Sequence, residues 1–425
     1  MNENKCFSRA DILLPDFHTV DPAKWAVVAC DQFTSEPEYW QSAEEIVGAS
    51  PSTLQMILPE VYLSETEARL PLINAAMKKI LSETLLCHKD AMIYVERTQS
   101  DGSIRRGIVL AVDLEQYDYR KGAASMIRAT EATVLERIPP RVAVRRGASV
   151  ELPHVMLLID DPKRTVIEPL IGAEAEFDAY DTDLMLKGGH IRGRFLTDAE
   201  IARMSDALDV LTEDNEMAAR YGKKGLAPLL FAVGDGNHSL ATAKATYEEI
   251  KARIGTDAAA CHPARFALAE VVNIHDEALK FEPIYRVLFD VDPDDVLSAL
   301  KEYVTSLSGD AAPQSTTFVH KNGEGELMIE HPLRQLTVGT LQDFIDDYLT
   351  THKEATVDYI HNEDSLRALA VRENAIGFLF SGMSKDQLFK TVIFDGALPR
   401  KTFSMGHAED KRYYMECRRI TTEGN

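Results

Sequence analysis

The stretch PLLFAVGDGNHSL, residues 228–240, predicts how the centre of the chain folds. Its first part, Pro228–Val233, is an apolar run with the length of a buried strand. After the turn, apolar residues return at helical spacing and share one helix face: Leu240, Ala243, Tyr247, Ile250 and Ile254. Gly255 is placed to end that helix, because glycine readily adopts the left-handed conformation of a helix C-terminus. A strand, a glycine turn and a helix in this order are a building unit of α/β folds.

The turn between strand and helix has the chemistry of an anion site. Gly234 and Gly236 permit backbone angles that a Cβ atom would oppose, and they let a ligand approach the main chain closely. Asn237 or Ser239 is a good N-cap for the helix. The first N–H groups of a helix, together with its partial positive charge, favour an anion there. The turn therefore predicts a phosphate-binding site.

Two ionisable side chains extend this prediction towards catalysis. Asp235 would repel a phosphate unless it holds a divalent cation or receives a proton from a nucleophile. His238 is a candidate proton carrier or phosphate contact. The plain alternative is a connecting turn in which Asp235 caps the helix and His238 is packed, and the motif alone leaves both interpretations open. The spacing fits neither the Walker pattern nor the dinucleotide pattern GxGxxG.

Alternating elements along the rest of the chain indicate a mixed α/β fold. We expect strands at Trp25–Cys30, Ala91–Arg97, Ile104–Asp113, Val155–Ile159, Val166–Leu170 and Glu270–Ile274, and helices at Glu36–Val47, Glu65–Glu83, Asp198–Thr212 and Pro293–Leu307. Asp101-Gly102 predicts one hairpin turn and Asp160–Lys163 a second. A chain of 425 residues exceeds one ordinary core. A composition shift predicts an α/β domain of residues 1–280, which carries the turn, and a smaller α/β domain of residues 281–425.

The composition excludes several classes of partner. The formal charge of −22, from 46 basic and 68 acidic residues, works against a general affinity for nucleic acid or anionic membranes. Five scattered cysteines without CxxC spacing argue against a disulfide framework or a thiolate zinc site. The N-terminal residues lack the apolar core of a signal peptide, and no window approaches the ~18 apolar residues of a membrane span. We expect a cytoplasmic protein.

Other charged residues have two interpretations each. Asp31 directly follows an expected buried strand, a usual place for functional carboxylates in α/β sheets, but it could equally cap the next helix. Arg128, Glu131 and Arg137 lie at helical spacing, for which a solvated, salt-bridged face is the plain interpretation.

Two further stretches favour the plain interpretation. Asp160-Asp161 is more typical of a turn than of a metal pair, and Gly188–Arg194 more typical of a flexible connector than of a phosphate-binding loop.

Four segments, in matching order, resemble the DUF1015 family of bacterial and archaeal proteins. FAVGDGNHSLATA resembles its Asp-Gly-His-His-Arg turn, WAVVACDQF its early strand ending in Tyr-Asp, IRATEAT its Arg-Pro-His-Glu-Arg/Lys-Thr segment, and LPRKTFSM its Pro-Lys-Ser-Thr-Phe signature. The resemblance implies that Arg128 and Glu131 are site residues. A looser resemblance of the turn to the ParB/sulfiredoxin-like fold, which includes ADP-dependent free-serine kinases, implies such a fold for the N-terminal unit and nucleotide phosphates at the turn.

The sequence departs from the family pattern at two positions. Asn237 stands where the first His is usual, and Ser239 replaces the Arg. Losing that Arg removes a bidentate phosphate contact. Arg128 is the first candidate to replace it, and Arg137 the second.

We therefore predict a nucleotide-dependent phosphotransferase that acts on a small hydroxyl metabolite, for which a hydroxy amino acid such as serine is the suggested example. The predicted cofactors are Mg²⁺, held by Asp235, and ADP or ATP; Asp235 or Glu131 would position or deprotonate the hydroxyl. The enzyme class stays open between a small-molecule kinase and a nucleotide hydrolase. The alternative is a nucleotide- or metabolite-binding regulator without turnover. We expect no nucleic-acid or membrane partner, and a homo-oligomer stays open.

Overall fold

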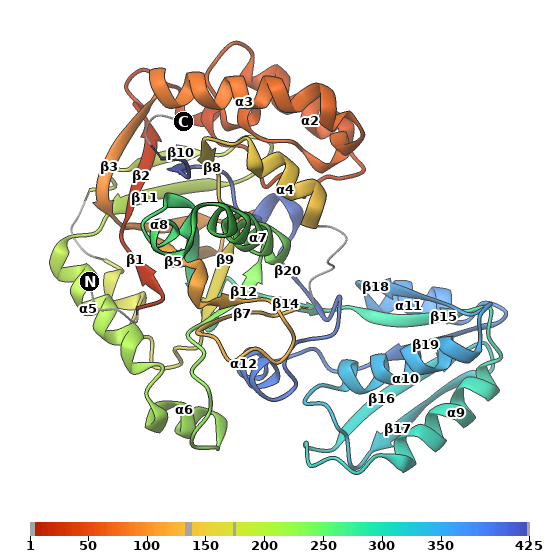
Figure 1. Cartoon of the computed structure of the whole chain (residues 1–425). Coiled ribbons are helices and arrows are strands. Elements are labelled where there is room, and N and C mark those ends of the chain that lie inside the picture. The colour runs from red at the N-terminus through yellow and green to blue at the C-terminus, as the bar shows by residue number, and fades with distance from the viewer. Residues whose placement is uncertain (1–4, 132–137, 173–175, 423–425) are drawn as a thin grey trace. The chain divides into compact units, whose positions relative to one another are not determined.

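Helices and sheets are interleaved along the described chain, which confirms the predicted mixed α/β class (Figure 1). The computed structural model describes residues 5–131, 138–172 and 176–422. Contacts divide the chain into unit 1, which comprises Met1–Ala129, Thr133–Leu279 and His407–Asn425, and unit 2, which comprises Thr130–Ala132 and Lys280–Gly406. The chain thus leaves unit 1 at Leu279 and returns to it at His407.

The C-terminal segment, residues 407–422, packs with unit 1, whereas the composition shift predicted that it belongs to a domain of residues 281–425. Backbone pairing holds it there. Leu13 and Cys417 exchange two N–H···O bonds of 2.8 and 2.9 Å, and β21 (Arg418–Arg419) pairs antiparallel with β8 (Val150–Glu151). Pairing between such distant segments leaves no trace in local composition, on which the predicted boundary rested.

A ten-stranded sheet forms the centre of unit 1 within the described residues. Its main path has the order β10-β11-β4-β5-β13-β9-β12-β7-β6, and β1 pairs with β5 outside this path. The strands are β1 (Phe7–Ser8), β4 (Ile93–Thr98), β5 (Ile104–Asp113), β6 (Tyr117–Asp118), β7 (Ile127–Ala129), β9 (Met156–Ile159), β10 (Tyr180–Asp183), β11 (His190–Phe195), β12 (Phe231–Asp235) and β13 (Phe266–Asn273). A separate pair joins β2 (Ala10–Pro15) to β3 (Leu85–Ala91).

Strand directions define two edges of this sheet. β9 is antiparallel to β12 and parallel to β13, while β5 is antiparallel to β13. The end of β12 and the beginning of β9 therefore share one edge, here called the turn edge. The ends of β9 and β13 and the beginning of β5 share the other, here called the loop edge.

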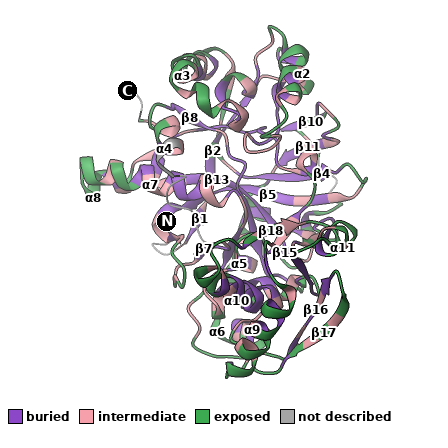
Figure 2. Cartoon of the chain, turned by 90° about the vertical axis from the view of Figure 1, so that its right-hand side faces the viewer, coloured by how far each residue is buried: buried purple, intermediate pink, exposed green. Residues whose placement is uncertain are grey.

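Both faces of the sheet are covered by apolar cores. Along β5, Val109 and Ala111 belong to one core, whereas Ile108 and Val112 belong to the other, as the two-residue period of a strand requires. Helices α2 and α3 contribute to the first core, and α5 and α7 to the second. Figure 2 shows β5 and β13 as buried strands in the middle of unit 1. The helices of unit 1 are α1 (Pro22–Trp25), α2 (Pro37–Val47), α3 (Thr66–Glu83), α4 (Ile138–Arg146), α5 (Asp198–Val210), α6 (Asp214–Tyr221), α7 (Asn237–Ile254) and α8 (Thr256–Ala260).

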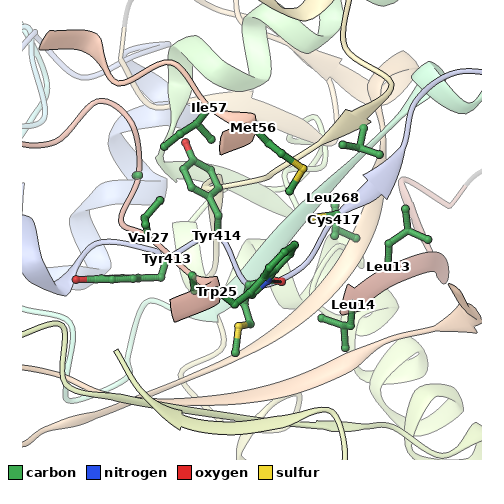
Figure 3. Packing of buried hydrophobic residues seen from close by; sticks show 14 of the residues in the cluster. Leu13, Leu14, Trp25, Val27, Met56, Ile57, Leu268, Tyr413, Tyr414 and Cys417 are labelled. Carbon is green, nitrogen blue, oxygen red and sulfur yellow. Dashed lines mark hydrogen bonds between the residues drawn. The ribbon is translucent and has the colours of Figure 1, made fainter. Parts of the chain in front are cut away.

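The C-terminal segment inserts aromatic side chains into the first core. Tyr413 and Tyr414 are 1% and 2% exposed, and the indole Nε1 of Trp25 donates a 2.9 Å hydrogen bond to the Met415 carbonyl. Figure 3 shows Tyr414 close to Ile57 in this core. The last part of the chain is therefore a structural component of unit 1.

Unit 2 has its own antiparallel sheet in the order β17-β16-β19-β15-β18, with a second pair, β14-β20. The elements are β14 (Phe281–Pro283), β15 (Tyr285–Phe289), α9 (Pro293–Ser306), β16 (Gln314–His320), β17 (Gly323–Ile329), α10 (Thr337–Thr351), β18 (Thr356–Ile360), α11 (Glu363–Ala370), β19 (Ala375–Leu379), α12 (Lys385–Phe394) and β20 (Phe403–Met405). Of the helices described in either unit, none is both long enough and apolar enough to cross a membrane.

Several predicted elements are confirmed and two are wrong. The strand–turn–helix at β12 and α7 and the hairpin of β4 and β5 are present. The expected strand Val166–Leu170 is wrong, because β9 pairs with β12 and β13 instead and Glu168–Leu170 forms a 3₁₀ helix. The expected strand Trp25–Cys30 is also wrong, since α1 ends at Trp25 and a single bridge joins Val28 to Tyr413.

Candidate functional site

Gly236 joins β12 to α7 in a left-handed conformation, with φ +79° and ψ 27°. A Cβ atom at this position would lie 3.1 Å from Val155 Cα and 3.2 Å from its Cγ2. Glycine is therefore needed for two reasons, the positive φ and the close packing on the start of β9.

Gly234 has a different role from the one its turn position suggests. Its φ is not positive, but a Cβ atom would lie 2.8 Å from Leu158 Cγ on the neighbouring strand β9. The glycine is thus required by packing within the sheet, and the backbone freedom of the turn rests on Gly236.

Asp235 forms an ion pair with a lysine from the C-terminal segment. Its Oδ1 accepts a 2.9 Å hydrogen bond from the Gly236 N–H, and its Oδ2 lies 3.2 Å from Lys411 Nζ. The two side chains are 23% and 17% exposed, so both keep access to solvent. A carboxylate and an ammonium group therefore stand side by side immediately before the first turn of the 18-residue helix α7.

Asp31 and His154 lie in the same unit, next to this pair. Asp31 Oδ2 is 3.7 Å from His154 Nε2, and His154 Cδ2 is close to Gly236, 3.4 Å from where a Cβ atom would stand. Although burial alone would raise the pKa of Asp31, the charges of His154 and Lys411 and a hydrogen bond from Gln32 lower it below its usual value. Asp31 is thus ionised at neutral pH, and Lys411 stabilises both carboxylates.

Tyr414 orients the histidine. Its hydroxyl lies 2.8 Å from His154 Nδ1 and accepts a 3.1 Å hydrogen bond from the Cys30 N–H. Burial, with the neighbouring Cys30 and Asp31, raises the pKa of Tyr414 well above its usual value, so the hydroxyl keeps its proton. The contact fixes the orientation of the His154 ring, so that Nε2 faces Asp31. We call Asp31, His154, Asp235, Lys411 and Tyr414 the turn cluster.

The remaining turn residues lie on the first turn of α7. Asn237 Nδ2 donates a 3.4 Å hydrogen bond to the Val233 carbonyl, and the His238 carbonyl accepts a 2.7 Å bond from Thr242 Oγ1. Asn237, His238 and Ser239 are all half-buried. All three belong to the first turn of α7, but the N-cap residue is Gly236, so the predicted N-cap at Asn237 or Ser239 is wrong.

Arg128 is not brought to the turn. It lies on β7, a strand parallel to β12, and the predicted helical spacing of Arg128 and Glu131 is therefore wrong. Its Nε donates to the Ser125 carbonyl at 2.9 Å, and its Nη2 donates to the Ala227 and Pro228 carbonyls at 2.9 and 3.1 Å. This guanidinium holds the segment that leads into β12, at the end of the strand away from Gly236.

The other two predicted residues around Arg128 lie elsewhere. Glu131 belongs to unit 2, where it forms a bridge with Leu398. Arg137 lies outside the described residues.

The two stretches with open interpretations are structural. Asp161 accepts hydrogen bonds from the Thr165 and Val166 N–H groups, and Asp160 binds Tyr221 and His275, each at 2.7 Å. Asp160-Asp161 thus closes a loop, although not the predicted hairpin. Most of Gly188–Arg194 is strand β11, and its arginines pair with glutamates, Arg192 with Glu96 and Arg194 with Glu200, so the expected flexible connector is wrong.

Metal-binding capacity at the turn is limited. Among the described residues, no group of three or more His, Cys, Asp or Glu side chains is arranged to hold a metal ion. Asp235 and Asp31 offer carboxylate oxygens, the ligand type that Mg²⁺ prefers, but most of its coordination shell would have to come from water and substrate phosphates.

The family model described as "Protein of unknown function (DUF1015)" matches residues 14–394. The chain belongs to the DUF1015 family. The DUF1015 match confirms the resemblance found in the sequence and spans parts of both units, while the LPRKTFSM segment lies beyond the matched range.

Solved structures similar to this DUF1015 chain are only distantly related. A free serine kinase variant in complex with AMP is 10% identical, with 74% of this chain and 91% of that chain covered and a TM-score of 0.37. A conserved hypothetical protein from Pyrococcus furiosus is also 10% identical, with 74% and 95% covered and a TM-score of 0.35. Truncated SbnI from Staphylococcus aureus is 9% identical, with 74% and 87% covered and a TM-score of 0.34. No curated protein matches the DUF1015 chain. TM-scores of this size carry no argument about ligand or reaction.

Sequence reasoning missed three members of the turn cluster. His154, Lys411 and Tyr414 reach the turn through pairing of strand β9 and of the C-terminal segment, and no local motif marks them. A pair of adjacent buried tyrosines, Tyr413-Tyr414, near the chain's end was the available signal that this end packs into a core.

Proposed function

We propose that the protein is a nucleotide-dependent phosphotransferase that acts on a small hydroxyl metabolite, with the nucleotide phosphates at the N-terminus of α7. The observation that carries this proposal is the Lys411–Asp235 pair, 3.2 Å apart, directly before that helix. It supplies a cation for phosphate and a carboxylate for the hydroxyl in one place.

Phosphate binding follows from the geometry of the helix start. Gly236 has no side chain that could cover the first turn, and the partial positive charge of the helix favours an anion. Lys411 Nζ adds a full charge that can move from Asp235 to a phosphate oxygen, since both side chains reach solvent. Lys411 would in this way replace the arginine that the family pattern has at the position of Ser239.

The transfer itself needs little covalent chemistry from the protein. The substrate hydroxyl oxygen forms a bond to the terminal phosphorus, the bond between that phosphorus and the bridging oxygen breaks, and the shortened nucleotide leaves. Asp235, released by Lys411, accepts the hydroxyl proton. Asp31 is suited to a different task, because its lowered pKa makes it a weak base but a good ligand for Mg²⁺ bound to the phosphates.

Mg²⁺ with ADP or ATP, and a hydroxy amino acid such as serine as substrate, remain parts of the proposal. Mg²⁺ would neutralise charge on the transferred phosphoryl group. Glu131 lies in unit 2, and its role in positioning or deprotonating the hydroxyl stays a prediction.

Isothermal titration with ATP, ADP and CTP in the presence of Mg²⁺ tests nucleotide binding. We expect binding of at least one nucleotide, and loss of about tenfold in affinity for Lys411→Met, because a charge-assisted bond to phosphate is removed. Lys78→Met, at an exposed position on α3, is the matched control and should change nothing. Absence of binding by all three nucleotides would overturn the proposal.

A second candidate is a regulator that binds nucleotide without turnover. The observation in its favour is that both oxygens of Asp235 are already engaged, by the Gly236 N–H and by Lys411, as in a purely structural turn. Formation of a phosphorylated product from a panel of hydroxyl metabolites decides between the two. Turnover that Asp235→Asn abolishes supports the transferase, whereas nucleotide binding with no product supports the regulator.

A further inference from the structure

Two of the segments that carry the family resemblance meet in unit 2. Leu398, the first residue of LPRKTFSM, donates its N–H to the Thr130 carbonyl at 2.7 Å and forms a bridge with Glu131, both of which belong to IRATEAT. Neither segment supplies a residue to the turn cluster. Their meeting therefore needs a separate explanation.

The residues after Leu398 bring two cations to the ring of Tyr359. Arg400 Cζ lies 5.6 Å from the centre of that ring, and Lys401 Nζ lies 4.9 Å from it. Arg286 Cζ lies 4.6 Å from the same ring, because Arg286 on β15 is the direct cross-strand neighbour of Tyr359 on β18 (Figure 1). We call Tyr359, Arg286, Arg400 and Lys401, all of unit 2, the tyrosine cluster.

Arg286 holds the main chain of the cluster in place. Its side chain is fully buried, and its Nη1 and Nη2 donate to the carbonyls of Lys401 and Arg400 at 3.1 and 3.0 Å. Lys401 has a positive φ of 53°, an uncommon conformation for a residue with a Cβ atom. Strain of this kind persists where the surroundings enforce it. The side chains of Arg400 and Lys401 remain exposed, so both can contact a ligand.

Positive charge exceeds negative charge around the ring. Within the described residues the cluster has a single ion pair, between Arg400 and the exposed Asp346 at 3.9 Å, and Arg286 and Lys401 form none. Burial lowers the pKa of Arg286 to about 10, against the opposing charges of Asp346 and Glu131. Arg286 thus stays charged at neutral pH, and three cations are set against two carboxylates.

This excess is not expected from the composition. The chain has 68 acidic and 46 basic residues and a formal charge of −22. Cations held this close repel one another, and attraction to the face of one aromatic ring offsets only part of that repulsion. A bound anion would remove it and would accept hydrogen bonds from the two exposed side chains. The charge balance therefore indicates a negatively charged ligand.

We propose that the tyrosine cluster binds a small multivalent oxyanion, either a phosphate group or a dicarboxylate. Arg400 offers a planar pair of donors that matches two oxygens of such a group, and Lys401 adds a compact charge. Arg286 is buried and acts through its field and by fixing the loop. A multivalent anion is favoured over a monovalent one because the attraction grows with the charge of the ligand. The exposed Asp346 gives up Arg400 at little cost.

Isothermal titration of the whole protein with phosphate, pyrophosphate and succinate tests the proposal. We expect at least one of them to bind with a Kd below about 10 mM, and monovalent acetate to bind at least about tenfold more weakly. A preference for the phosphates or for succinate identifies the kind of oxyanion. Absence of binding by all three up to about 10 mM, or equal binding of acetate, would overturn the proposal.

Variants assign the binding to the cluster. Lys401→Asn removes the ammonium group and suits the left-handed backbone, and Arg400→Gln removes an exposed guanidinium; each should weaken oxyanion binding about tenfold. Lys301→Met, at an exposed position on α9 of unit 2, is the matched control and should bind normally. Circular dichroism and urea unfolding of the same samples verify that the variants are folded.

The same titrations separate this site from the turn cluster. Lys411→Met should leave oxyanion binding unchanged if the anion binds at the tyrosine cluster. Loss of binding in Lys411→Met, with Lys401→Asn and Arg400→Gln unchanged, contradicts the proposal. Nucleotide binding at the turn is a separate measurement, so either proposal can fail without the other.

Chemical labelling of the unaltered protein locates the anion directly. Lys401 is exposed, so an amine-acetylating reagent should modify it at a rate that peptide mass spectrometry measures. At about ten times the Kd of the anion, about nine tenths of the sites are occupied, and the acetylation rate of Lys401 should fall about tenfold. The acetylation rate of Lys301 should stay the same. An unchanged rate at Lys401 would show that the anion does not bind there.

Discussion

Lys411 Nζ lies 3.2 Å from Asp235 Oδ2, although Lys280–Gly406, the main part of unit 2, separates these residues in the sequence. The ion pair is partly exposed, so it should add less than about 1 kcal/mol to stability. Its importance is chemical, because it places a mobile cation at the start of α7.

Replacing Lys411 should accordingly affect ligand binding more than folding. We expect Lys411→Met to change the free energy of unfolding in urea by less than about 1 kcal/mol while it weakens nucleotide binding about tenfold. Lys411→Arg keeps a phosphate donor and should bind more tightly than Lys411→Met. A large loss of stability with unchanged nucleotide affinity would instead show that the lysine is structural.

Gly236→Ala should destabilise the protein through two separate effects. The left-handed conformation costs about 1 kcal/mol for a residue with a Cβ atom, and the new methyl group would also press on Val155 at 3.1 Å. Gly222→Ala is a matched control, because Gly222 has φ +75° at the end of α6 but open space around it. Urea unfolding should show a loss of about 1 kcal/mol for Gly222→Ala and of about 2 to 3 kcal/mol for Gly236→Ala. Equal losses of unfolding free energy in the two variants would mean that β9 shifts to accommodate the methyl group without further cost.

Asp31 should make stability fall in acid. Its pKa is lower in the folded protein than in the unfolded chain, so the stabilisation is fully present above the unfolded value of about 4 and is lost as the pH falls through the lower, folded value. Asp31→Asn should therefore flatten part of the acid limb, which is the fall in melting temperature as the pH is lowered below about 5. Asp206→Asn, on the exposed face of α5, serves as the control and should leave the limb unchanged. An acid limb of full slope in Asp31→Asn would contradict the assignment.

Glu270 should be among the most sensitive positions of unit 1. Its carboxylate is 1% exposed and contacts two buried guanidinium groups, those of Arg105 and Arg412. Glu270→Gln removes the carboxylate that pairs with Arg105 and leaves Arg412 with Glu416 alone, and breaking a buried ion pair in this way typically costs about 3 to 5 kcal/mol. Urea unfolding of this variant is compared with Glu249→Gln, which breaks an exposed pair with Arg146 and should cost less than about 1 kcal/mol. Similar small losses in both variants would show that water reaches Glu270.

Local patterns in the sequence predicted those elements whose partners are near in the chain. β12 and α7 follow from apolar periodicity and glycine positions, and the β4–β5 hairpin follows from the Asp101-Gly102 turn. Val166–Leu170 was wrongly predicted to be a strand that pairs with β9. The backbone of β9 instead pairs with β12 and β13, which both lie much later in the sequence. A hydrophobic run alone does not reveal which partner it will find.

The candidate site shows the same limit more strongly. Gly236 and Asp235 were visible as a motif, whereas His154, Lys411 and Tyr414 join them through tertiary packing. Arg128 illustrates the converse error, since family resemblance suggested a ligand contact and the guanidinium instead binds three main-chain carbonyls.

The late position of the C-terminal segment affects the order in which a nascent chain can mature. Unit 2 emerges complete from the ribosome before residues 407–422, while unit 1, begun much earlier, must wait for them. Until then the Trp25 indole lacks the Met415 carbonyl and Asp235 lacks Lys411. Domains generally fold as units during synthesis, so the inserted unit can fold first. The turn cluster is thus assembled only after residues 407–422 have been synthesised, and a chain terminated before Lys411 is made without it.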